Sequence, residues 1–337
     1  MKKILTTLTL CIGMAGAASA QDPNFSQFFA SPLTMNPAQT GKFDGEFRAA
    51  MNYRNQWPTI NNAYTTATAS FDMGIMKNRI AANDQFGIGF LGFMDQAGDG
   101  ALKNSYFGLS TAYHKSLDEN GYHSIGAGFQ GTFVSKRLNT LNLKFQDQLT
   151  PFGFTNVSLD PYANRQFSIN YFDLNAGFMY NGTTNGYNTF YLGASMYHIN
   201  RPKENFDGGD FILSARTTIQ AGAKLPVGTY NALHLSANHS MQAKAKNTML
   251  GGAFSLNANN DEENPTNLYL GAWYRFNDAM IPYLGLEFGE WHVGATYDVN
   301  TSSLKAASAS RGGIELSVIY IRKHSDPSMK RLNCPKF

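Results

Sequence analysis

Two glycine-rich motifs are the first residues of this 337-residue chain that could carry chemistry. Residues 87–92 and 126–131 both match the spacing G-x-G-x-x-G, which lets the backbone of dinucleotide-binding proteins approach a pyrophosphate at the start of a helix. Such a site needs the glycines between a strand and a helix. Here both motifs lie inside alternating strand patterns with no helical pattern after them. We therefore interpret the glycines as part of a strand face that points into a lumen.

The histidines and the acidic clusters do not indicate a metal site or a hydrolase. His234 and His239 are five residues apart in a predicted strand, so they point to opposite faces. The acidic segments 207–210 and 261–263 lack the ligand ladder of a calcium-binding loop and are better explained as turns. Neither H-E-x-x-H nor G-x-S-x-G occurs. We expect no catalytic, cofactor-binding or metal-binding residues.

The first 20 residues have the composition of a secretory signal peptide. Lys2 and Lys3 precede an apolar stretch, and Ala18-Ser19-Ala20 is a small-x-small cleavage site. Cleavage before Gln21 places the mature chain outside the cytoplasm and leaves Cys334 without an intrachain disulfide partner. We therefore predict residues 1–20 as a signal peptide.

Charge and hydropathy restrict the class of the mature chain. Loss of Lys2 and Lys3 lowers the count of Lys and Arg from 27 to 25, against 24 Asp and Glu. No basic stripe marks a nucleic-acid surface. After Ala20 no apolar run approaches the roughly 18 residues of a spanning helix. A membrane protein with this sequence must then be a closed β-barrel, because only helices and closed barrels satisfy their backbone groups in lipid.

Alternating apolar and polar residues recur through the whole mature chain. In residues 267–288, one face carries Leu268, Leu270 and Leu284, and the other carries small, aromatic and charged residues. Fourteen such segments predict an all-β, transmembrane, antiparallel outer-membrane barrel over residues 46–322. A soluble β-array is the alternative, but no linker divides the chain. The lumen-facing candidates are Arg48, Arg54, Asp173, Trp273, Arg275, Tyr283, Glu287, Asp298 and Glu315.

The connections support a barrel with long extracellular loops and short periplasmic turns. The predicted outer loops are 95–105, 136–170, 199–214 and 301–311. The predicted inner turns are 118–121, 181–187, 226–229 and 289–290. Residues 323–337 are expected to form a periplasmic C-terminal tail.

Residues 21–45 break the strand pattern with several prolines. Asn36 can cap a short helical turn that begins at Pro37 and ends at Gly41. Two arrangements remain open: a periplasmic arm, or a segment folded into the lumen with Phe25, Phe28 and Phe29 as anchors. We favour the lumen.

Several sequence blocks resemble the PorP/SprF family of type IX secretion system membrane proteins. They are QDPNFSQFFASPLTMNPAQTG (21–41), NYRNQWP (52–58), GASMYHINRP (193–202), LGAWYRFNDAMIPYLG (270–285), YDVNTSSL (297–304) with GGIELSVIY (312–320), and CPKF (334–337). The loops 136–170 and 199–214 match least.

The resemblance implies an outer-membrane protein that works with the type IX export machinery. It implies binding of a secreted surface protein, such as a gliding adhesin, through its C-terminal domain, in support of export or attachment. It also implies association with the periplasmic ring of the system, and no enzymatic activity or cofactor.

Two functions are compatible with this sequence. The first is a non-enzymatic secretion partner, whose partner-binding candidates are Phe25, Phe28, Phe29, Trp57, Arg137, Arg201 and Phe206, since aromatic residues and Arg are enriched at protein interfaces. Each of the loop residues could instead pack onto the barrel rim. The second is a porin-like diffusion channel for small solutes, lined by the lumen-facing charges.

Overall fold

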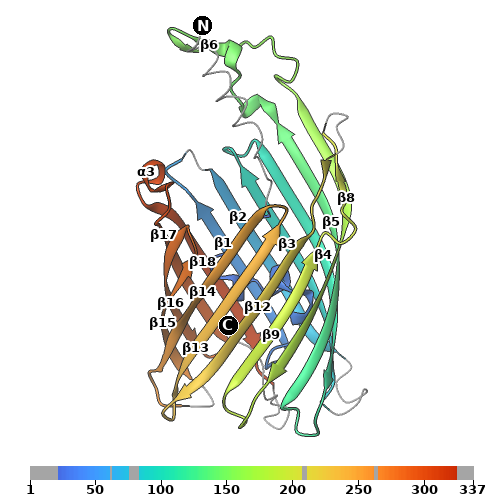
Figure 1. Ribbon diagram of the computed structural model, residues 1–337, viewed down its shortest axis with the longest axis vertical. Coiled ribbons are helices and arrows are strands. Elements are labelled where there is room, and N and C mark those ends of the chain that lie inside the picture. The colour runs from blue at the N-terminus through green and yellow to red at the C-terminus, as the bar shows by residue number, and fades with distance from the viewer. Residues whose placement is uncertain (1–21, 61–62, 76–82, 207–210, 262–264, 325–337) are drawn as a thin grey trace.

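The computed structural model describes residues 22–60, 63–75, 83–206, 211–261 and 265–324, and these form a closed antiparallel barrel of fourteen strands (Figure 1). This confirms the predicted fold class. The first strand pairs with the last from Phe47↔Arg322 to Gln56↔Gly313, so the ladder has no open ends there. The barrel strands, in chain order, are β1 (Phe47–Gln56), β2 (Tyr64–Ile75), β3 (Gln85–Ala97), β4 (Leu102–Ser116), β5 (His123–Asn139), β8 (Gln166–Gly182), β9 (Thr189–Tyr197), β12 (Arg216–Val227), β13 (Asn231–Gln242), β14 (Ala245–Asn257), β15 (Thr266–Arg275), β16 (Ala279–Phe288), β17 (Trp291–Asn300) and β18 (Arg311–Arg322).

Each strand presents one apolar face outward and one mixed face inward. Leu270 and Leu284 are exposed on the outside of β15 and β16, whereas Trp273 and Tyr283 are buried inside. The same period of two runs through the other strands, because successive side chains of a pleated strand point to opposite faces. The outer surface is therefore an apolar band suited to lipid.

The long connections gather at one end of the barrel, called here the outer end. They include the loop between β5 and β8, with the hairpin β6 (Leu149–Thr150) and β7 (Gly153–Phe154), which stands above the rest of the molecule in Figure 1. The loop between β9 and β12 carries the hairpin β10 (Lys203–Glu204) and β11 (Phe211–Ile212). The loop between β17 and β18 carries α3 (Lys305–Ser308).

Strand ends differ from the predicted loop boundaries at several connections. The expected long loop at 95–105 is wrong, because Ala97 pairs directly with Leu102 and only a tight turn remains. The loop predicted at 136–170 is shortened to 140–165 by ladder pairing from Asn139↔Gln166 downward. Polar residues at these strand ends lie beyond the apolar band, where hydrogen bonding continues although the hydrophobic pattern fades.

The N-terminal segment lies inside the barrel. Residues 22–43, called the plug from here on, contain η1 (Phe28–Ala30), α2 (Pro32–Met35) and η2 (Pro37–Gln39), drawn in blue within the barrel in Figure 1. Ser26, Gln27, Leu33 and Asn36 are completely buried there. No helix among the described residues is long and apolar enough to cross a membrane. The predicted signal peptide, Gln21 and the tail from residue 325 lie outside the described residues.

The assigned faces predict the effect of a charge in the apolar band. Leu284, in the middle of β16, is 53% exposed on the outer face, so Leu284→Arg should cost about 2 to 4 kcal/mol of barrel stability in a membrane. The control is Leu149→Arg, since Leu149 is similarly exposed but lies in the outer loop. The measurement is the yield of heat-modifiable barrel in outer membranes. Equal yields from the two variants would contradict the assignment.

Candidate functional site

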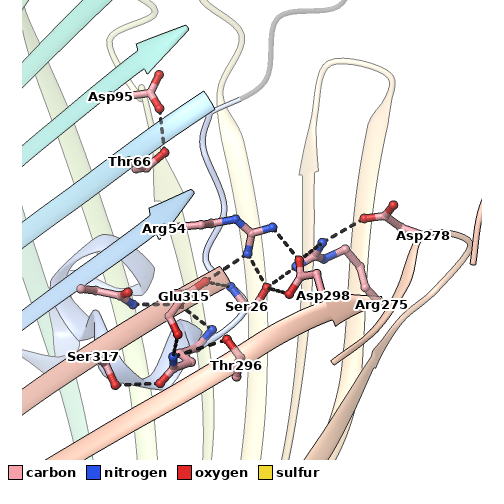
Figure 2. Close-up of polar contacts among 12 residues, drawn as sticks. Ser26, Arg54, Thr66, Asp95, Arg275, Asp278, Thr296, Asp298, Glu315 and Ser317 are labelled. Atoms are coloured by element: carbon pink, nitrogen blue, oxygen red, sulfur yellow. Dashed lines mark hydrogen bonds and ion pairs between the residues drawn. The ribbon is translucent and has the colours of Figure 1, made fainter. Parts of the chain in front are cut away.

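A network of buried charges fastens the start of the plug to the barrel wall (Figure 2). Arg54 of β1 donates to Asp298 of β17 at 2.7 Å and to Glu315 of β18 at 3.0 Å. Arg275 of β15 donates to the same Asp298 at 3.0 Å. Ser26 of the plug completes the network: its hydroxyl donates to Asp298 at 2.7 Å, and its backbone N–H donates to Glu315 at 2.7 Å.

We call this network the latch. It stabilises the fold only while every buried charge in it keeps its partners. All five residues are buried, and a buried charge without its partners is strongly destabilising. The plug supplies hydrogen bonds to both carboxylates of the wall, and the hydroxyl of Ser26 also accepts from Arg275 at 2.6 Å. The inward charges of the wall therefore favour an occupied lumen.

A second cluster holds the plug at the outer end of the barrel. His198, just after β9, lies 2.7 Å from Asp22 through Nε2 and 2.9 Å from Asp173 through Nδ1. Arg216 at the start of β12 lies 3.3 Å from Asp22. Burial by itself would lower the pKa of His198, but the carboxylates of Asp22 and Asp173 outweigh it and raise the pKa to about 9. At neutral pH the ring is therefore charged and can donate to both carboxylates.

An aromatic patch on β15 and β16 receives the next part of the plug. The ring of Phe29 lies 5.1 Å from that of Trp273 and 5.5 Å from that of Tyr283, edge to face with the latter. Phe28 is buried in the same cluster, which also includes Met249 and Tyr269. Such aromatic pairs add about 0.5 to 1.5 kcal/mol each beyond their burial.

Glycines of the wall make room for the plug backbone. A Cβ built on Gly87 would lie 2.3 Å from the carbonyl oxygen of Thr40, and one on Gly128 would lie 2.4 Å from the backbone nitrogen of Ala38. Real Cβ atoms do not approach other atoms so closely. These glycines belong to the two G-x-G-x-x-G motifs. The motifs thus admit a polypeptide segment into the lumen, and each lies within a strand, β3 or β5.

Asn36 joins the middle of the plug to β8 and β9. Its side chain accepts from the backbone N–H of Ala38 at 2.9 Å, which confirms the predicted cap of the turn at Pro37. Its amide nitrogen donates to the carbonyl oxygens of Phe178 at 3.0 Å and Ala194 at 3.3 Å. One side chain thus caps the start of a helical turn and binds the barrel wall.

The structure places the lumen-facing candidates on the inner surface. Glu287 is half-buried and accepts from Asn267 at 2.9 Å. Arg48 pairs with Asp72 at 2.8 Å near the inner end, where Asp72 also accepts from the plug backbone at Gly41. The buried candidates are Arg48, Arg54, Asp173, Trp273, Arg275, Tyr283, Asp298 and Glu315.

The partner-binding candidates are divided between the lumen and the rim. Phe25 and Phe28 are buried inside the barrel, and Phe29 packs on Trp273, so these rings contact the wall and are not available to a partner in this arrangement. This is the arrangement in which the three rings are anchors in the lumen, and their role in binding a partner stays a prediction.

The remaining partner-binding candidates lie at the outer end. Trp57 is half-buried and packs on Tyr64 at 5.6 Å. Arg137 and Arg201 are exposed, and Phe206 is half-buried. The sequence prediction omitted Asp22, Ser26, His198 and Arg216, although Asp22 is the second residue after the predicted cleavage site and His198 lies in one of the family-like blocks.

A cavity of about 60 Å³ lies beside the plug in the outer half of the lumen, bordered by Asp22, Phe93, Tyr106 and His198. Among the described residues, no group of three or more His, Cys, Asp or Glu side chains could hold a metal ion. The acidic segments 207–210 and 262–263 are outside the described residues. The arrangement is suited to closing a barrel and fastening a peptide segment within it.

Together the closed ladder, the apolar outer band and the filled lumen define an outer-membrane β-barrel protein. The match to the family model "Type IX secretion system membrane protein PorP/SprF" extends over residues 17–320, and the chain belongs to this family. Comparison with curated protein sequences finds no match.

The chain is similar to several solved structures. The Pseudomonas putida toluene transporter TodX is similar with a TM-score of 0.51 and 9% identity, covering 86% of this chain and 92% of TodX. A Pseudomonas aeruginosa FadL homologue has a TM-score of 0.45 and 12% identity, covering 91% and 96%. BamA from Haemophilus ducreyi, lacking POTRA domains 1–3, has a TM-score of 0.41 and 10% identity, covering 82% and 70%.

The plug backbone lies close to Gly87, so alanine should have different effects at Gly87 and at Gly92, two glycines of one motif. Gly87→Ala should displace the plug and cost about 1 to 3 kcal/mol through overpacking. Gly92→Ala is the control on the same strand, because the atom nearest to its Cβ would be the Ala69 carbonyl oxygen at 3.8 Å. Limited proteolysis of the plug in purified protein measures the difference. Equal protection in both variants would contradict the packing described.

The latch predicts a large effect for Arg54. Arg54→Ala leaves Asp298 and Glu315 short of a buried partner and should destabilise the protein by about 3 to 5 kcal/mol. Arg322→Ala, which breaks a half-exposed pair with Glu290 at 3.3 Å, should cost about 0 to 1 kcal/mol. The measurement is urea denaturation in detergent. Similar urea midpoints for Arg54→Ala and Arg322→Ala would contradict a stabilising role of the latch.

His198 predicts a loss of plug attachment at alkaline pH. Its pKa is raised from about 6.5 to about 9, so the stabilisation is fully present below pH 6.5 and is lost as pH rises through 9. Cleavage within residues 22–26 by a broad-specificity protease should increase between pH 7 and pH 10, measured against a cleavage site in the outer loop. His198→Gln should abolish the pH dependence. If cleavage of His198→Gln still increased with pH, the pH dependence would belong to a group other than His198.

Proposed function

We propose that this protein is a non-enzymatic outer-membrane component of the type IX secretion system that binds a secreted surface protein through its C-terminal domain. Binding would support export of that protein or its attachment to the cell, including an adhesin in gliding cells. The observation that carries the proposal is the filled lumen. A barrel closed by its own N-terminal segment is poorly suited to solute flow, which leaves its ends as the working surfaces.

The outer loop between β5 and β8 supports a protein partner at the outer end. Phe152 is fully exposed, Leu159 is 91% exposed and Val157 is 74% exposed. A groove of about 330 Å³ lies in the same loop, bordered by Leu143, Phe145 and other residues. Apolar side chains gathered on a surface above the lipid band favour association with another protein.

The channel is the second candidate, and the likeness to a toluene transporter is the observation that favours it. That likeness supports a shared barrel fold, whereas the plug opposes solute flow. The test is conductance in planar bilayers, with wild type compared with a variant that lacks residues 22–43. Stable conductance of the wild type would favour the channel; conductance of the shortened variant alone would favour the proposed function.

Co-purification tests the proposed function. The tagged protein, extracted from its own outer membranes in mild detergent, should retain a large surface protein through its C-terminal region, and components of the periplasmic ring, identified by mass spectrometry. The double variant F152S/L159S should lower recovery of the surface protein about tenfold if the two side chains contribute roughly 1.4 kcal/mol.

Tyr187→Ser is the matched control for this experiment. Tyr187 is 76% exposed but lies at the inner end, between β8 and β9. Its substitution should leave recovery of the surface protein unchanged. Recovery of a solitary barrel from wild-type cells would contradict the proposal.

A further inference from the structure

The barrel wall has a step between β8 and β9 at its outer end. β8 runs for 17 residues and pairs with β5 along its whole length. β9 pairs with β8 only from Gly182 up to Ala176. Above this point β8 continues toward the tall outer loop, as Figure 1 shows on the right of the barrel. Among the described residues, 166–171 are therefore paired in a ladder only with β5, while β10 contacts β8 through Glu204, which accepts from the hydroxyl of Tyr171 at 2.8 Å.

The hydrogen bonds at the step show which backbone groups face the side away from β5. The N–H of Leu174 donates to the side chain of Asn200 at 3.0 Å, and its carbonyl accepts from Ile199 at 2.9 Å. Both groups of one residue face the same side in an antiparallel pair, so Ser168 and Asn170 also point their N–H and C=O groups there. Asn200 ends the β9 side of the ladder and leaves these groups beyond it.

This edge lies above the apolar band. The outward side chains of β8 change from Leu174 and Phe172, which are exposed apolar residues, to Asn170 and Ser168, which are exposed polar ones. The edge therefore meets water and whatever protein stands outside the membrane. An unpaired strand edge accepts a further strand, which gains main-chain hydrogen bonds at each second residue.

Basic side chains lie near this end of β8, although Arg137 is on β5, the side of β8 away from the edge. Arg165 directly precedes β8, Arg137 of β5 is paired with Ser168, and Arg201 follows Asn200. All three are exposed. Their charge favours an added strand that carries acidic side chains or a carboxylate.

A second copy of this chain does not fit the edge. In one membrane both copies of β8 run in the same direction at the same depth, so antiparallel pairing would invert one barrel. In a parallel pair, the residues whose N–H and C=O groups face the partner strand lie opposite residues whose groups face away. Two identical edges can therefore pair in parallel only if one strand is shifted by one residue along the other. Equal depth opposes this shift, so we take the neighbour to be a different chain.

We propose that residues 166–171 of β8 are the site where an extended, acidic strand of the exported surface protein adds to the barrel wall. The proposal rests on the proposed function and specifies where and how that partner is held. Specificity would come from the three arginines, and the main-chain hydrogen bonds of the edge would supply sequence-tolerant affinity.

A photo-crosslinker at the edge tests this site. Benzoylphenylalanine in place of Ser168 is irradiated in cells, and the linked peptide is identified by mass spectrometry. We expect a segment of an exported protein with net negative charge. Asn170→Pro removes one N–H that points to the edge and leaves the hydrogen bonds to β5 intact, and edge strands tolerate proline at such a position. This substitution should lower the yield of crosslinked product about tenfold. Asn170→Ala keeps the N–H and should have little effect.

The remaining outcomes separate the edge from the proposed function. If the surface protein co-purifies but no crosslink forms, or if Asn170→Pro leaves the crosslink unchanged while the barrel remains heat-modifiable, the edge proposal is overturned and the proposed function stands. Crosslinks only to lipid or to another copy overturn it too. If no surface protein co-purifies with the wild type, both fall. Should Asn170→Pro fail to assemble, Arg137→Glu with Arg201→Glu must reduce the crosslink, or the edge proposal is overturned.

Discussion

The width of a fourteen-stranded barrel is the constraint on which the rest of this structure depends. Closing the ladder satisfies the backbone in lipid, but a barrel of this size is too wide for its own wall side chains to fill. The inward face also carries Arg54, Arg275, Asp298 and Glu315, which are buried. Without further partners these groups would be costly to keep in the lumen. The plug resolves both problems, since it fills space and supplies polar groups to the charged wall.

Plug and wall are matched in shape as well as in charge. The plug begins beside His198 at the outer end, contacts the aromatic patch on β15 and β16, crosses to β8 at Asn36, and reaches Asp72 near the inner end. Where its backbone comes nearest to the wall, the wall has glycine. Because this path runs through the lumen from the outer end to the inner end, the surfaces that other molecules can reach include the outer loops, the strand edges beside them and the inner turns.

The alternation of side chains was enough to predict the barrel, because period-two patterning is a local property of each strand. It was less informative where side chains become polar beyond the lipid band, so β3 and β4 were ended too early around residues 95–105. The plug's contacts were harder still. Asp22 and His198 are 176 residues apart, and nothing in either local pattern indicates the other. The lumen glycines could be placed on an inward face, but the segment they accommodate could not be derived from their spacing.

The most direct test of the account is a disulfide between plug and wall. The hydroxyl oxygens of Thr40 and Ser110 are 2.9 Å apart, a separation compatible with the Cβ distance of about 3.5 to 4.5 Å in a disulfide. Thr40→Cys and Ser110→Cys, combined with Cys334→Ser, should form this bond in outer membranes, whereas Thr40→Cys with Ser105→Cys on the opposite face of β4 should not. Mass spectrometry of the unreduced protein measures it. Free thiols in both pairs, with residues 22–43 open to protease, would contradict a plugged lumen.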